Sequence, residues 1–207
     1  MSESPKFWDR VAEKYAKSPV ADEAAYQKKL GVTRDYFRAD MEVLELGCGT
    51  GSTAIAHAPY VKHIHAVDIS AKMLDIARKK AADQNVDNVT FERATVAELQ
   101  AANESYDAVL ALSVLHLLES RQAAIAKIKR MLKPGGVFVS STVCLGDKMK
   151  FFKIIGPVGK FFGLIPLVKV FTKQELLDSI TDAGFQIDYQ WQPGEGKAVF
   201  VVAKKVD

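Results

Sequence analysis

The stretch VLELGCGTGSTAIA, residues 43–56, decides the fold of this chain. Residues of strand character run into three glycines within five positions, and a helix-compatible run follows. A glycine turn between a strand and a helix lets the backbone approach a ligand closely, because glycine adopts positive φ and has no side chain. The stretch therefore predicts a nucleotide or nucleoside site against the turn.

The spacing of the glycines separates two classes of site. A dinucleotide site has the pattern G-x-G-x-x-G, whose third glycine permits close packing of helix and strand. Gly47 and Gly49 fit this pattern, but Ser52 stands at the third position and Gly51 comes one place early. Glu45 also ends the strand, where its carboxylate would point into the ligand crevice. The pattern favours a ligand with a cationic group over a dinucleotide.

Composition places the chain among ordinary globular proteins. It has 207 residues, 48% of them hydrophobic and 26% charged, which fits one domain over residues 1–207. The net charge of +3 is too small to indicate a nucleic-acid partner. Cys48 and Cys144 form neither a disulfide framework nor a zinc-binding spacing, so we expect no metal site. Without a signal-peptide pattern, a cytoplasmic location is expected.

Strand and helix patterns alternate along the chain. Strands are predicted at residues 41–46, 63–69, 89–94, 106–114 and 136–143. Helices are predicted at residues 5–17, 22–38, 52–57, 70–84, 96–102, 120–132 and 172–183. This alternation implies a doubly wound α/β sheet, mostly parallel, with helices on both faces. Two final strands, 185–191 and 197–205, predict an antiparallel hairpin at the sheet edge.

The strand ends indicate where a ligand would bind, because doubly wound sheets bind ligands at the carboxyl ends of their strands. Glu45 ends the first predicted strand, and Asp68, near the end of the second, is placed to accept hydrogen bonds from ribose hydroxyls. Ile69 and Met73 would supply apolar faces for an aromatic base. These residues predict a pocket for a nucleoside with a cationic or amino-acid tail.

Four motifs in this order resemble the class I S-adenosylmethionine-dependent methyltransferases: VLELGCGTG, AVDIS followed by ML, YDAVLALSVLHLL and MLKPGG. The resemblance is to the small-molecule group that includes the ubiquinone and menaquinone biosynthesis enzymes, and it covers roughly residues 7–205. The family implies a Rossmann-like, seven-stranded sheet with an antiparallel last strand. It also implies S-adenosylmethionine as cofactor and S-adenosylhomocysteine as product.

The resemblance implies a set of cofactor contacts at the strand ends. These residues are Tyr15, Glu45, Gly47, Cys48, Gly49, Asp68, Ile69, Met73, Ala94, Thr95, Val96, Leu112 and Ser113. Among them, Tyr15 resembles the aromatic residue that closes over the cofactor. Ser113 and the neighbouring Leu112 and Leu115 would border the transferred methyl group. Cys48 is expected to be a small filler in the turn. Thr95 departs from the family, in which an acid often accepts from the adenine amino group, and a neutral hydroxyl accepts more weakly.

His116 follows the fourth predicted strand and is the candidate general base. A hydroxyl or protonated nitrogen acceptor needs such a base, since it must lose a proton. The alternative is a histidine that packs or bonds a backbone carbonyl, and His57, His63 and His65 are expected to be structural or exposed. The chain lacks the Pro-Pro and Pro-Cys motifs of enzymes that methylate DNA bases, so that activity is not expected.

Residues 146–173 form the most basic segment, with six lysines, one acid and five of the eleven phenylalanines. We expect a lid-like insert at 146–172 after the fifth strand and an N-terminal helical cover at 1–40. One interpretation makes its apolar residues core. The other places them against a hydrophobic acceptor, or weakly against a membrane surface that the lysines attract.

The predicted function is transfer of a methyl group to a small, apolar acceptor at oxygen, nitrogen or carbon. Two alternatives remain. A nicotinamide-binding Rossmann reductase is disfavoured by the glycine spacing and by Glu45. A non-catalytic module that holds the cofactor without turnover has the same sequence pattern.

Overall fold

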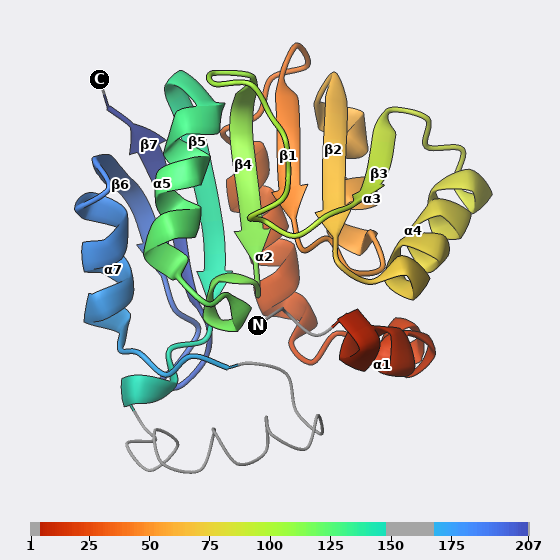
Figure 1. The fold of residues 1–207 in the computed structure, drawn as a ribbon, viewed down its shortest axis with the longest axis horizontal. Helices are drawn as coiled ribbons and strands as arrows, with labels where there is room; N and C mark the ends of the chain where they lie inside the picture. The colour runs from red at the N-terminus through yellow and green to blue at the C-terminus, as the bar shows by residue number, and fades with distance from the viewer. Residues whose placement is uncertain (1–4, 148–167, 207) are drawn as a thin grey trace.

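The computed structural model describes residues 5–147 and 168–206, which are built around one seven-stranded sheet (Figure 1). The strands are β1 (Glu42–Leu46), β2 (His63–Asp68), β3 (Val89–Arg93), β4 (Tyr106–Leu112), β5 (Leu132–Thr142), β6 (Phe185–Trp191) and β7 (Val199–Lys205). Their order is β3-β2-β1-β4-β5-β7-β6. The first five strands pair in parallel, and β7 is antiparallel to both β5 and β6. The predicted fold is confirmed.

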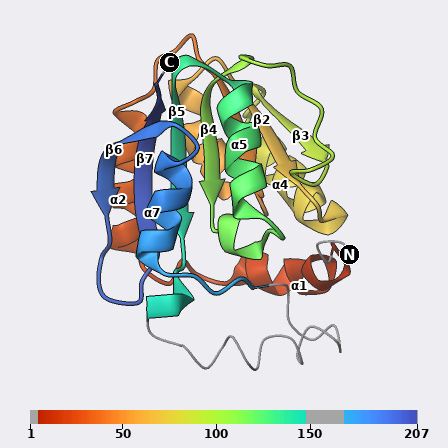
Figure 2. The same cartoon turned by 60° about the vertical axis from the view of Figure 1, so that its left-hand side comes forward.

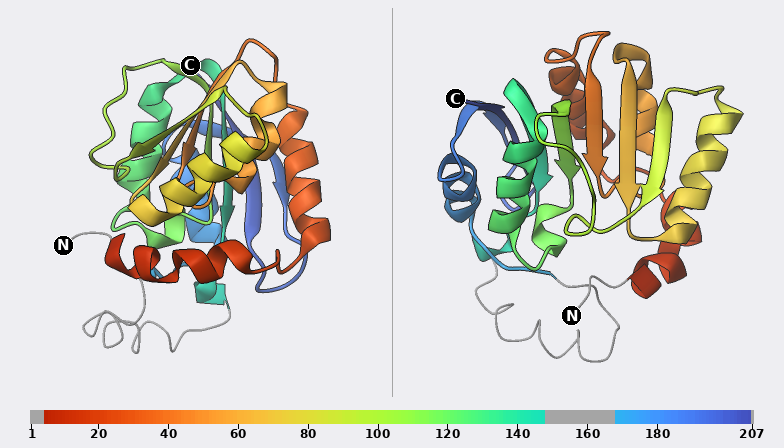
Figure 3. Two further views of the ribbon diagram at one scale, coloured as in Figure 1. Left: turned by 90° about the vertical axis from the view of Figure 1, so that its right-hand side faces the viewer. Right: turned by 45° about the horizontal axis from the view of Figure 1, so that its top comes forward.

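Helices cover both faces of the sheet (Figure 2). The helices are α1 (Pro5–Lys17), α2 (Glu23–Arg34), α3 (Ser52–His57), α4 (Ala71–Asp83), α5 (Arg121–Met131) and α7 (Lys173–Thr181). Short 3-10 turns are η1 (Ala58–Tyr60), η2 (Leu115–Leu117) and η3 (Leu145–Asp147). α5 and α7 pack on one face, and α2, α3 and α4 pack on the other. α1 lies across the carboxyl ends of the parallel strands (Figure 3).

Alternation along the strands divides the core in two. In β7, Val201 and Ala203 belong to the cluster under α5 and α7, whereas Phe200 and Val202 belong to the cluster under α2 and α3. Successive side chains of a strand point to opposite faces, so a strand buried on both faces is apolar throughout. Glu45 places a carboxyl group within this apolar pattern, and only 3% of the residue is exposed.

The predicted helix at 96–102 is wrong. The structure has a turn there, with one helical hydrogen bond from the Leu99 N–H to the Thr95 carbonyl at 3.0 Å. Lys127 Nζ donates instead to the carbonyls of Ala97 and Leu99, at 2.8 and 2.7 Å. A short run cannot offset the cost of helix nucleation when a side chain takes the carbonyls that would extend it.

The two largest shifts of a predicted boundary concern the second helix and the fifth strand. The second helix ends at Arg34 rather than at residue 38, and β5 begins at Leu132 rather than at residue 136. The KPGG run at 133–136 does end α5, but it then forms an irregularity between the Leu132 and Val137 pairings of β5 with β4.

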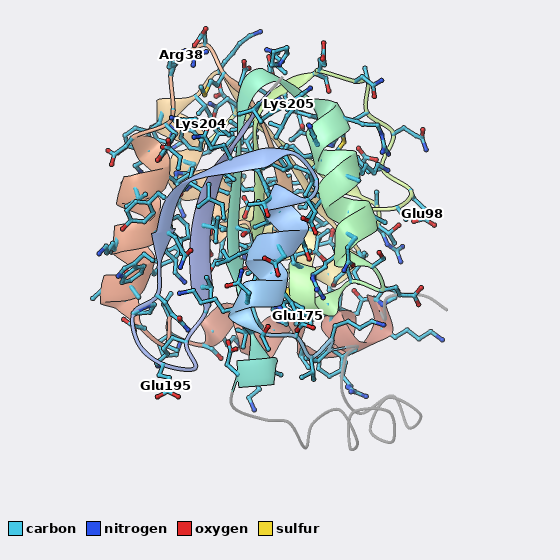
Figure 4. All side chains as sticks on the ribbon, turned by 90° about the vertical axis from the view of Figure 1, so that its left-hand side faces the viewer. Arg38, Glu98, Glu175, Glu195, Lys204 and Lys205 are labelled. Atoms are coloured by element: carbon cyan, nitrogen blue, oxygen red, sulfur yellow. The ribbon has the colours of Figure 1, made fainter. Side chains whose placement is uncertain are left out.

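The basic segment lies mostly outside the described residues, since 148–167 are not described. In the ranges 5–147 and 168–206, no helix is both long enough and apolar enough to cross a membrane. The turn between β6 and β7, which contains Glu195, lies at the same end of the sheet as the carboxyl ends of the parallel strands (Figure 4). Lys204 and Lys205 lie at the opposite end.

Candidate functional site

Two cavities open at the carboxyl ends of β1, β2 and β4. The first has a volume of about 370 Å³ and is lined mostly by apolar side chains from α1, the strand ends and η2. The second has a volume of about 560 Å³ and lies among α2, the glycine turn and the β6–β7 hairpin. Both cavities are lined by Tyr15, Gly47, Gly49, Leu112 and Ser113. The glycine turn and the end of β4 therefore join the two cavities.

The three glycines of the turn have different tasks. Gly47 and Gly49 have φ angles of 66° and 54°, in the left-handed region that favours glycine. A Cβ on Gly49 would meet no atom within 4 Å, so this position faces open space in the cavities. A Cβ on Gly51 would lie 2.8 Å from the Cβ of Ala77 in α4. Gly51 thus allows the turn to pack on α4, a role that the sequence pattern did not reveal.

Asp68 ties the second strand to the glycine turn. Its Oδ2 accepts from the Gly49 N–H and its Oδ1 from the Ser70 N–H, both at 2.8 Å. Burial raises the pKa of Asp68, although these backbone hydrogen bonds oppose the shift. Asp68 lines the first cavity beside Ile69 and Met73, as expected for ribose and base contacts.

The turn after β3 places two of its three expected residues on the first cavity. Ala94 and Val96 are among the described residues that line it, and Thr95 is not. The Thr95 hydroxyl donates to Glu98 Oε2 at 2.9 Å and accepts from the Glu98 N–H at 3.0 Å. Glu98 projects from the outer edge of the molecule (Figure 4). Thr95 therefore stabilises the turn and is not among the described residues that line the first cavity.

Glu45 lies on the second cavity with an unsatisfied carboxyl oxygen. Its Oε2 is buried and has no hydrogen-bond partner among the described residues. Burial, helped by the negative charge of Asp68, raises the pKa of Glu45 to about 8. Buried polar atoms rarely lack partners, so this oxygen is suited to a ligand that donates hydrogen bonds. Cys48 lines the same cavity, and burial raises the pKa of its thiol well above the usual range, which fits an inert filler.

Lys29 is a residue of the second cavity that sequence reasoning missed. From α2, its Nζ donates to Ser141 Oγ at the end of β5, at 2.9 Å. It is half-buried, and desolvation lowers the pKa of its ammonium group. Lys29 shares a helix face with Tyr26 and the buried Thr33, three and four positions away. A lysine on the inner face of a helix was the available signal, because lysines are seldom buried without a role.

His116 lines the first cavity from η2, next to Leu117 and Leu118. Burial lowers the pKa of its imidazole, which is therefore neutral at pH 7. Its Nδ1 is buried without a partner in the described part of the chain, and its backbone carbonyl accepts from the Lys169 N–H at 2.7 Å. The structure thus brings His116 to the predicted place in the form that a base requires.

The other three histidines do not line the first cavity, although His57 lines the second and its two ring nitrogens have no partner among the described residues. His57 is fully buried, packs edge-on against Phe37 at 5.0 Å, and burial lowers its pKa to about 3. His65 bonds Tyr106 and Glu92, both at 2.8 Å. His63 bonds Thr90 Oγ1 at 3.1 Å and approaches Glu42 at 3.2 Å.

Ser113 and Tyr15 stand where the cavities meet. Ser113 has a φ angle of 62°, which is uncommon for a residue other than glycine, and its N–H donates to the Ser141 carbonyl at 2.7 Å. Such strained residues cluster at functional sites, where the surrounding structure holds them. Tyr15 comes from α1 and remains 55% exposed.

Comparisons with known proteins identify relatives of this chain. The family described as "methyltransferase domain" matches residues 43–136. A demethylmenaquinone methyltransferase of Leptospira interrogans is 32% identical over 196 residues, which cover 82% of this chain and 77% of that protein. The uncharacterized methyltransferase YcgJ of Bacillus subtilis is 32% identical over 102 residues, which cover 49% of this chain and 40% of that protein.

The fold is also shared with solved structures. The crystal structure of the YcgJ protein superimposes with a TM-score of 0.72 at 17% sequence identity, covering 87% of this chain and 99% of that one. At this level of identity the likeness concerns the fold alone.

Proposed function

This chain belongs to the S-adenosylmethionine-dependent methyltransferase family, and we propose that it transfers a methyl group to a small, apolar acceptor. One observation carries the proposal: a neutral imidazole with an unpartnered, buried Nδ1 lines an apolar cavity that contacts the glycine turn. Its relatives are methyltransferases, so the nicotinamide alternative is not favoured.

The residues present fit the cofactor. Gly49 leaves open space for a ligand, and the unpartnered Oε2 of Glu45 is suited to an ammonium group. Lys29, on the same cavity, is suited to the carboxylate of an amino-acid tail. In the first cavity, Asp68 would hold the ribose, and four apolar residues would enclose the base: Ile69, Met73, Ala94 and Val96. A buried acid and a half-buried lysine on one cavity match a zwitterionic tail, because each charge gains an opposite partner.

The acceptor would occupy the remaining end of the first cavity. Besides His116, the described lining of this cavity includes Trp8, Leu117, Leu118 and Val168, which are apolar or aromatic. Such a wall favours an acceptor that buries apolar surface, since desolvating a charged one would cost free energy. The Leptospira relative is named for an acceptor of this kind, demethylmenaquinone.

Methyl transfer would require three functions of this chain: shielding from water, positioning of the acceptor and removal of a proton. When bound, S-adenosylmethionine supplies a sulfonium methyl group that is already activated for transfer. Trp8 and Tyr15 of α1 would shield the bound group from water, and Leu112 and Ser113 would border the point of transfer. His116 accepts the proton of a hydroxyl acceptor at a ring nitrogen, which leaves the acceptor oxygen free to take the methyl group.

The cofactor half of the proposal is tested at Gly49. Gly49→Val should abolish binding of S-adenosylhomocysteine, measured by calorimetry, because the side chain enters the joint between the cavities. Gly135→Val is the matched control: Gly135 also has positive φ and open space, but it lies in the exposed KPGG turn. Equal affinity in wild type and Gly49→Val would overturn the cofactor assignment.

The acceptor half is tested with pairs of acceptors. Phenols or quinols that carry an apolar chain are compared with partners of equal size that carry sulfonate or phosphate groups. We expect methylation of the apolar member of each pair, detected by mass spectrometry. Preference for the highly charged members would reject the apolar acceptor and leave the cofactor site standing. Cofactor binding without turnover on any acceptor would favour the non-catalytic module.

A further inference from the structure

We propose that Asp9 is a positioning residue that latches α1 over the first cavity and slows release of the cofactor. The inference rests on the proposed function, since it takes the nucleoside to lie in that cavity. It concerns the contact between α1 and the first turn of α4, for which no catalytic role has been argued above.

α1 forms one wall of the first cavity through Trp8 and Tyr15. It also lies across the carboxyl ends of the strands (Figure 3). A nucleoside in this cavity would therefore leave more readily when α1 moves aside. The rate of release then depends on how firmly α1 is held.

Apolar packing holds α1 weakly. Of its thirteen residues only Ala12 is buried, and Tyr15 is 55% exposed. Elements with few buried apolar contacts open at low free-energy cost. A directional polar contact at one end of α1 can therefore dominate its attachment.

Asp9 supplies that contact. Its Oδ1 accepts from Ser70 Oγ at 2.6 Å and from the Lys72 N–H at 3.2 Å. The hydrogen bond from Ser70 is the main cause that lowers the pKa of Asp9, so the carboxylate is charged at neutral pH. A carboxylate at the first turn of a helix also interacts favourably with the helix dipole.

The partner of Asp9 belongs to the cofactor loop. Ser70 is fully buried, and its hydroxyl caps α4 by accepting from the N–H of Met73 at 3.2 Å. Its own N–H donates to Asp68, whose other oxygen holds the Gly49 N–H. A continuous hydrogen-bonded chain thus runs from α1 to the glycine turn. Asp9 can accept these hydrogen bonds from Ser70 and Lys72 when Asp68 and Met73 are in the positions that line the cavity.

The experiment measures the association and dissociation rates of S-adenosylhomocysteine. Stopped-flow displacement can use Trp8 fluorescence in a Trp191→Phe background, since the chain has two tryptophans. Asp9→Ala should raise the dissociation rate about tenfold, the lower end of what a hydrogen bond to a charged group contributes, with little change in the association rate. Asp9→Asn retains an acceptor oxygen and should restore most of the slow release.

Glu13→Ala is the matched control, because Glu13 is an exposed acid on the same helix. A dissociation rate that is unchanged in Asp9→Ala, or raised equally in Glu13→Ala, would overturn the latch while leaving the proposed function intact. Changes in both rates with a lower melting temperature of the free protein, not rescued by Asn, would show a general structural role and also overturn it. Failure of the wild type to bind would instead overturn the proposed function.

Discussion

Desolvation shifts the pKa values of ionisable groups in both cavities, but its consequences differ between them. Burial drives ionisable groups toward their neutral forms, so it lowers the pKa values of His116 and Lys29 and raises that of Glu45. In the first cavity burial favours the neutral imidazole, which is the form that the proposed general base requires. In the second, burial disfavours the charged forms of Glu45 and Lys29, and a ligand with the opposite charges would favour those forms. Desolvation thus favours the form of His116 that the proposed proton transfer requires, whereas it disfavours the charged forms of Glu45 and Lys29 that the proposed ligand tail would pair with.

The largest expected effect tests the second cavity through Glu45. Its pKa is raised in the folded state from 4.5 to about 8, so the folded protein binds the extra proton over that interval. The free energy of unfolding of ligand-free protein should therefore fall as pH rises from about 5 to 8, by at most about 5 kcal/mol. Glu45→Gln should remove this loss, which urea denaturation at several pH values would measure.

Glu42 offers the matched control on the same strand. A hydrogen bond from Lys62 lowers the pKa of Glu42, so its contribution is present above the ordinary pKa and is lost as pH falls. Glu42→Gln should leave the slope between pH 5 and 8 unchanged. An identical slope in wild type and Glu45→Gln would show that Glu45 is ionised without a ligand, and the contrast between the cavities would fail.

The second prediction tests the first cavity. His116→Ala should lower turnover by roughly 10²–10⁴-fold with little change in cofactor affinity, the range for loss of a general base. Because burial lowers the pKa of His116, wild-type turnover should rise with pH below the ordinary imidazole value of 6.5 and be level at pH 7. Turnover on the preferred acceptor, measured between pH 4.5 and 8, checks both statements.

His63→Ala controls for the loss of any imidazole, since His63 lies on β2 outside the cavity lining. Normal turnover in His116→Ala would return His116 to a packing role. If turnover were independent of pH in both the wild type and His116→Ala, the acceptor would need no base.

The third prediction concerns the tail. Lys29→Met should lower the affinity for S-adenosylhomocysteine by about 10–100-fold, because a charge-assisted hydrogen bond is lost. The affinity for 5′-methylthioadenosine, which lacks the amino-acid tail, should not change. Lys28→Met is the control, because Lys28 lies on the same helix with its Nζ over the ring of Trp191, 4.3 Å from the centroid. Equal weakening of both ligands would place the effect of Lys29 in the fold instead.

The smallest expected effect concerns the turn after β3. Thr95→Val should change S-adenosylhomocysteine affinity by less than about twofold, because its hydroxyl is engaged with Glu98, and should cost about 1 kcal/mol of stability. Val96→Ala, which alters the cavity wall, should weaken binding by about 1 kcal/mol. Calorimetry measures the affinity of both variants for S-adenosylhomocysteine. A larger loss of affinity in Thr95→Val than in Val96→Ala would support Thr95 as an adenine contact.

Local patterns predicted the sheet and the strand-end residues well. The apolar strands and glycine turn predicted where Glu45 and Asp68 would lie, because parallel strands bring their carboxyl ends to one edge. Lys29 and Gly51 escaped prediction, since their roles arise from α2 reaching β5 and from the turn packing on α4. The helix predicted at 96–102 failed because Lys127, distant in sequence, takes the carbonyls of the turn.

The antiparallel course of β7 has a consequence for how such a protein can diversify. Because β6 and β7 join at the carboxyl end of β5, their turn gives Pro193, Lys197 and Ala198 to the wall of the second cavity. That turn is a surface loop far in sequence from the nucleoside residues. Insertions and deletions are well tolerated in such loops. This part of the wall of the second cavity can therefore change in length and sequence without disturbing the strands that position the glycine turn.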